Sequence, residues 1–200
     1  MARVLIGLLI SIAAATALAE GDADRGETLI ATCNACHGAD GNSPAGAFPD
    51  LAGQNPKYIV KQLVDIKSGE RDSPQMTGLL NNLDRQDFED IAAFYAMQEP
   101  DRGAAREDLV ELGEKIYRVG IPRKNIAACT ACHLPQGEGN NPAAFPALAG
   151  QWPEYLEKQL KAFRTGERTN DGDGRMMRSI AMDMSDEEIE AVSSYLHGLY

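Results

Sequence analysis

Cysteine, histidine and basic residues are all scarce in this sequence. Its 200 residues include four cysteines and three histidines. Only 19 Lys and Arg stand against 30 Asp and Glu, which gives a formal net charge of −11. Phosphate binding requires a basic face, so the composition argues against nucleic acid as a partner. It favours instead a docking partner with a positive patch.

Long apolar runs are also missing beyond the first 19 residues. The run from Val4 to Leu18 follows a single charge at Arg3 and ends in Ala17-Leu18-Ala19. It is shorter than the roughly 20 residues that a membrane-spanning helix needs, and its end resembles a signal-peptidase site. We expect residues 1–19 to be a cleaved signal peptide, with a retained membrane anchor as the alternative.

All four cysteines fall in two copies of one motif, C-x-x-C-H, at residues 33–37 and 129–133. Cysteines three positions apart share one face of a helical turn, so both thiols can reach the vinyl groups of one porphyrin. The following histidine can then ligate the iron. The motif predicts two covalently bound haem c groups, attached through Cys33, Cys36, Cys129 and Cys132, with His37 and His133 as iron ligands. Zinc or disulfide chemistry would leave both histidines unexplained.

The chain is an internal duplication. Residues 48–54, Phe-Pro-Asp-Leu-Ala-Gly-Gln, match residues 145–151, and Gly69-Glu70-Arg71 matches Gly166-Glu167-Arg168. We predict two haem domains, at residues 20–100 and 101–200, joined by a polar linker at 98–104. The first half is the more acidic, with 14 Asp and Glu against 6 Lys and Arg.

Both halves follow one helical plan, and no strand-like alternation is present. Each has a helix before the C-x-x-C-H turn, predicted over 23–36 and 108–117, in which Gly26 and Gly113 indicate close packing. A second helix begins at a proline and ends at a glycine, over 56–69 and 153–166. The last helices span 84–97 and 185–199, each with an apolar stripe that indicates a core. The fold class is therefore all-α.

A sixth iron ligand must come from methionine, because His197 alone remains and we expect it at the surface. Met76 lies in an irregular stretch of the first half. Aligning the last helices of the two halves gives an offset of 101 residues, which carries Met76 to Met177 and leaves Met184 as a core residue. A register error of one residue would select Met176 instead.

The surroundings of the ligands carry weaker expectations. A ligand histidine usually donates the N–H of its second ring nitrogen to a carbonyl oxygen, which Pro49 and Pro146 could offer. Arg71 and Arg168 hold matching positions, where they could pair with haem propionates or cap helix ends.

The sequence resembles the cytochrome c4 family, soluble diheme proteins built of two class I cytochrome c domains. The resemblance rests on both C-x-x-C-H motifs, the paired F-P-x-L-A-G-Q segments, Lys-Gln-Leu, Gly-Glu-Arg and residues 168–173. It implies two tandem haem domains facing each other across a pseudo-twofold interface, thioether ligands at Met76 and Met177, and electron transfer in the periplasm.

We therefore interpret the chain as an electron carrier and not an enzyme. The expected donor is a membrane cytochrome complex, and the expected acceptor is a terminal oxidase or another periplasmic reductase, with no small-molecule substrate. The alternative is a diheme peroxidase, which would need one open iron site; the sequence offers no surplus histidine for that rearrangement.

Overall fold

The computed structural model describes residues 21–200, so the predicted signal peptide, or membrane anchor, lies outside the described residues. Within that range the elements are helical, apart from two isolated bridges, which confirms the all-α prediction. No helix in residues 21–200 is both long and apolar enough to span a bilayer.

The first domain contains α1 (Ala23–Leu29), α2 (Asn34–His37), α3 (Pro56–Ser68) and α4 (Arg85–Ala96). Helix α1 crosses α4 at Gly26, where an added Cβ would lie 2.9 Å from Cβ of Phe94 and closer still to the carbonyl oxygen of Asp90. The prediction of one helix over 23–36 is wrong in detail. The chain tightens into a 3-10 turn at Ile30–Thr32, because the Cys33 N–H donates to Ile30 O, and α2 then begins anew.

The second domain repeats this plan with α5 (Val110–Val119), α6 (Thr130–His133), α7 (Pro153–Thr165), α8 (Met176–Ala181) and α9 (Asp186–His197). Gly113 packs on Ala191 and Tyr195 of α9, as Gly26 packs on α4. Ser185 and Glu188 form a capping box at the start of α9.

The middle helices begin and end as the sequence predicts. Helices α3 and α7 open with Pro56 and Pro153, whose missing N–H would have no partner in the first turn. They end at Gly69 and Gly166, which adopt left-handed φ values of 85° and 79°. The stripes predicted on the last helices are buried in the two cores, with Tyr95 in the first and Tyr195 in the second.

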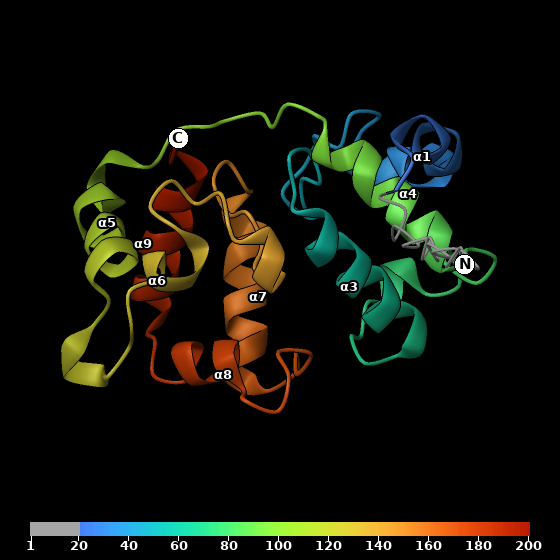
Figure 1. Ribbon diagram of the computed structural model, residues 1–200. Coiled ribbons are helices and arrows are strands. Elements are labelled where there is room, and N and C mark those ends of the chain that lie inside the picture. Colours follow the sequence, from blue (N-terminus) through green and yellow to red (C-terminus); the bar gives the residue numbers. More distant parts are fainter. Residues whose placement is uncertain (1–20) are drawn as a thin grey trace, which may run out of the picture.

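The two domains pack side by side, with α3 and α7 facing the boundary and the connecting chain passing along one end (Figure 1). Two glutamines clamp the boundary symmetrically. Gln54 receives an N–H from Ala147 and donates to its carbonyl, at 2.8 and 2.9 Å. Gln151 makes the same pair of bonds with the backbone of Asp50, at 2.9 Å each. Because each domain gives the other the same pair of hydrogen bonds, the two domains are related by a pseudo-twofold axis.

Candidate functional site

The first C-x-x-C-H motif forms a short helical turn. Cys33 precedes α2 and its carbonyl accepts the N–H of His37 at 3.0 Å, so both cysteines and the histidine belong to one compact turn. His37 is 8% exposed, and its ring lies 6.2 Å from that of Phe48. The Pro49 carbonyl, 2.9 Å from Nδ1, can only accept, so Nδ1 carries the proton and Nε2 keeps a free lone pair.

The second motif has the same geometry. His133 is 7% exposed, and its Nδ1 donates to the carbonyl of Pro146 at 3.0 Å. Both proline carbonyls thus take the role that the sequence suggested. Burial lowers the pKa of His37 and of His133, which keeps both rings in the neutral form that binds a metal.

The candidate methionine ligands differ in environment. Met76 ends the 3-10 turn Pro74–Met76 and packs, half-buried, against the core of the first domain. Met177 lies half-buried in α8, whereas its neighbour Met176 is 46% exposed. Met184 is 4% exposed and belongs to the core of the second domain, as predicted. Helix α8, which begins with Met176 and Met177, was not predicted from the sequence.

His197 is not the surface residue that we expected. It lies half-buried at the end of α9, where its ring stacks on Trp152 with centroids 5.5 Å apart. Its Nδ1 is 3.1 Å from the carbonyl of Gly150. The aromatic contact explains its burial, and a short-range sequence pattern does not reveal it because 45 positions separate the two residues.

Arg71 and Arg168 do not act as caps of helix ends. Each guanidinium bonds across the domain boundary, Arg71 to the hydroxyl of Tyr155 at 3.0 Å and Arg168 to that of Tyr58 at 3.2 Å. Gln62 completes the exchange by accepting from both arginines, at 2.8 and 3.0 Å. The functional residues that the sequence analysis missed therefore include Tyr58, Tyr155, Gln62 and Gln159. Both pairs of positions repeat between the halves, as Pro-x-Tyr and Lys-Gln-Leu.

This interdomain cluster carries more positive than negative charge. Besides the two arginines it contains Lys61, and Asp65 is the carboxylate that bonds within it, to Lys61 and to Asn170. Burial favours the neutral phenol of Tyr58, but the positive charge of Arg168 and Arg71 outweighs it and lowers its pKa. Buried positive charge in excess fits the two carboxylates that a haem carries, so the residues present suit the group.

The alternative zinc reading finds no support in this arrangement. The two cysteine pairs belong to separate domains, and nowhere in residues 21–200 do three or more Cys, His, Asp or Glu side chains gather as a metal site. Two turns of the C-x-x-C-H type, each with a buried histidine held by a carbonyl in a small helical domain, define a two-domain c-type cytochrome.

Comparisons with known proteins place the chain within that class. The family model for cytochrome c matches residues 23–96 and again 110–199. A cytochrome c4 of Azotobacter vinelandii is 48% identical over 100% of both chains. The crystal structure of reduced cytochrome c4 from Pseudomonas stutzeri has a TM-score of 0.88 and 49% identity, over 90% of this chain and 100% of that one. A protein of Stutzerimonas stutzeri named thiosulfate dehydrogenase electron acceptor is 42% identical, over 82% of this chain and 76% of its own length.

The chain belongs to the cytochrome c family and, within it, to the cytochrome c4 proteins. It is a diheme electron-transfer protein that carries two covalently bound haem c groups, and its partners are redox proteins. These relatives are electron carriers and not enzymes, and they give no support to the peroxidase alternative.

Proposed function

We propose that this protein shuttles electrons in the periplasm from a membrane cytochrome complex to a terminal oxidase or another periplasmic reductase. The observation that carries the proposal is that each domain contains a buried, oriented histidine and also a half-buried methionine. If both ligate the iron of their domain, that iron is closed to exogenous ligands, which suits a carrier.

We assign the thioether bonds to Cys33, Cys36, Cys129 and Cys132, and the iron ligands to His37, Met76, His133 and Met177. When bound, haem c supplies an iron that alternates between the ferrous and ferric states and so carries one electron. The chain's own residues hold the geometry constant. The hydrogen bonds to the Pro49 and Pro146 carbonyls fix the planes of the two imidazoles, which limits rearrangement between redox states.

The clamp at the domain boundary supports a relay between two fixed sites. Gln54 and Gln151 make four hydrogen bonds across the boundary. Arg71 and Arg168 each add a bond to a tyrosine of the other domain, so that the domains are tied together from both sides. Buried side-chain hydrogen bonds of this kind each contribute about 1 kcal/mol, so the domains resist separation. A constant separation allows an electron entering one domain to leave from the other.

The cellular placement of the protein is part of the proposal. We assign residues 1–19 to a cleaved signal peptide, and residues 20–100 and 101–200 to the two haem domains. Two observations support export to the periplasm, which is an oxidising compartment: the two c-type attachment motifs, and the apolar N-terminal run that ends in Ala-x-Ala.

The relative named as an electron acceptor of thiosulfate dehydrogenase suggests a second donor to test. The experiment mixes the reduced protein with oxidase-containing membranes of its source organism and follows its oxidation by absorbance, with and without cyanide. We expect rapid, cyanide-sensitive oxidation. The second donor is tested in a separate reaction, which supplies thiosulfate and a thiosulfate dehydrogenase to the oxidised protein. If the membranes oxidise the reduced protein no faster than buffer alone, the terminal-oxidase assignment is overturned, whichever protein is the donor.

A further inference from the structure

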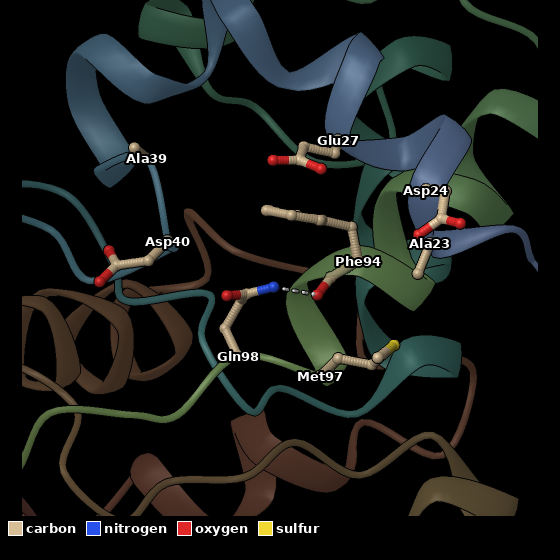
Figure 2. A pocket seen from close by; sticks show the side chains of 8 residues that line it. All are labelled: Ala23, Asp24, Glu27, Ala39, Asp40, Phe94, Met97 and Gln98. Atoms are coloured by element: carbon tan, nitrogen blue, oxygen red, sulfur yellow. Dashed lines mark hydrogen bonds between the residues drawn. The ribbon is translucent and has the colours of Figure 1, made fainter.

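A groove of about 580 Å³ opens on the first domain, between α1, the end of α4 and the residues that follow the first C-x-x-C-H motif. Figure 2 shows the side chains of Glu27, Asp40 and Phe94 around this opening, with Met97 at its edge. Phe94 forms an apolar wall, and Met97 is 76% exposed. Exposed methionine is adaptable and recurs at protein docking surfaces. The groove thus combines apolar contact area with acidic sides.

The carboxylates at this groove are those of Asp24, Glu27 and Asp40. All three residues are exposed, and the ion pairs found in residues 21–200 include none of them. The groove therefore has negative charge that no cation within the described residues pairs.

The second domain shows how the equivalent position is filled. Arg118 lies in α5, donates from Nε to Glu114 at 2.9 Å, and places its guanidinium carbon 6.0 Å from the centre of the Tyr195 ring. Its Nη1 is 3.5 Å from the carbonyl oxygen of Pro135. One arginine thus covers a carboxylate, an aromatic face and the chain just after the C-x-x-C-H motif.

The internal repeat matches each of these contacts to a residue of the groove. Glu114, Tyr195 and Pro135 correspond to Glu27, Phe94 and Ala39, and all three counterparts line the groove. The match is structural as well, because Gly26 packs on Phe94 as Gly113 packs on Tyr195.

The remaining counterpart is the one that differs. Counted from Gly113 and Gly26, the residue that corresponds to Arg118 is Ala31, which lies in the 3-10 turn just after α1. Ala31 is exposed and too short to reach Glu27. The carboxylate, the aromatic wall and the chain turn of an arginine site are therefore all retained, and the arginine itself is missing.

We propose that this groove is the docking site for a redox partner protein that inserts an arginine side chain where the second domain places Arg118. The inserted guanidinium bonds Glu27 and lies against the ring of Phe94, while Asp24 and Asp40 attract neighbouring basic groups. Ala39 and Asp40 follow His37 by two and three residues, so the docked partner meets the segment that carries the first C-x-x-C-H motif. The second domain, whose own arginine occupies the site, does not bind the partner in this way. This inference rests on the proposed function as a shuttle between protein partners.

Filling the groove from within tests the proposal. Ala31→Arg copies Arg118 into the first domain, and Ser68→Arg adds the same charge at an exposed position at the end of α3. Oxidation by oxidase-containing membranes is measured for both variants and the wild type, as kcat and KM. We expect Ala31→Arg to raise KM about tenfold with kcat unchanged, the order of effect of losing one anchoring arginine, and Ser68→Arg to change KM less than twofold. Unchanged haem spectra verify that both variants fold.

A second arm does not depend on the partner. N-acetyl-arginine methylamide is titrated into the labelled protein, with the uncharged citrulline analogue as control, and NMR shifts are followed at Glu27 and at the methyl group of Met97. We expect shifts with the arginine compound in the wild type and in Ser68→Arg, and none in Ala31→Arg. Equal KM values for the two variants would overturn the groove as docking site. Wild-type protein that membranes cannot oxidise would instead contradict the proposed shuttle, and the titration alone would then decide for the groove.

Discussion

Replacing Gly113 by alanine should weaken the second domain, because no space exists for a methyl group where α5 crosses α9. An added Cβ would lie 2.6 Å from Cβ of Tyr195 and closer still to the carbonyl oxygen of Ala191. Ordinary contacts between such atoms are about 3.5–4.0 Å, so the helices must separate by about 1 Å.

The expected magnitude follows from two opposing effects. Overpacking of this kind costs about 1–3 kcal/mol, and the better helix propensity of alanine returns about 0.5–1 kcal/mol. The net loss is at most about 2.5 kcal/mol, with a central value of about 1 kcal/mol. A loss of about 1 kcal/mol lowers the melting temperature of a domain of this size by about 4–8 °C.

The assay is thermal unfolding of the haem-loaded protein, followed by absorbance of the iron–methionine band. Gly174→Ala is the matched control, because no atom lies within 4 Å of its added Cβ, and it should leave the melting temperature unchanged or slightly raised. Gly26→Ala should act on the first domain in the same way as Gly113→Ala acts on the second. The reasoning is refuted if Gly113→Ala melts at the temperature of Gly174→Ala.

Three further outcomes are expected. Met177→Leu should abolish the methionine–ferric absorption of the second haem while Met176→Leu preserves it; the reverse result would assign Met176. Gln151→Ala should cost about 1–3 kcal/mol by removing two hydrogen bonds across the boundary, seen as faster amide exchange at Asp50, and unaltered exchange would count against the clamp. Burial raises the pKa of Asp50 to about 6 from 3.8, so the folded state holds this proton more tightly and stability falls as pH rises from about 4 to 6. Asp50→Asn should flatten that part of the stability profile, as monitored by urea unfolding, and a profile identical to the wild type would disprove the effect.

Local signals in the sequence predict much of this molecule. Proline and glycine mark the ends of α3 and α7, and Gly26 and Gly113 mark the two close helix crossings, because each residue type has a specific steric role there. The histidine turns follow from motif spacing, and the Pro49 carbonyl was expected from the need to orient a ligand ring.

Other features depend on contacts between distant residues and could not be read locally. The stacking of His197 on Trp152 joins residues that are 45 positions apart within the second domain. The exchange of guanidinium groups across the boundary arises only when the two domains dock. The repeat placed Arg71 and Arg168 at equivalent positions, yet the tyrosine that each one bonds lies on the opposite domain. The groove of the first domain could likewise not be predicted locally, because its meaning depends on comparing Ala31 with Arg118 of the second domain.

The central claim is that both irons are closed by a protein methionine, as an electron carrier requires. The most direct test is the absorption spectrum of the exported protein, oxidised and reduced, with and without carbon monoxide. The account predicts two covalent low-spin haems per chain, both with the methionine–ferric band and neither binding carbon monoxide. Binding of carbon monoxide to one haem of the native protein would contradict it, because that iron would be open.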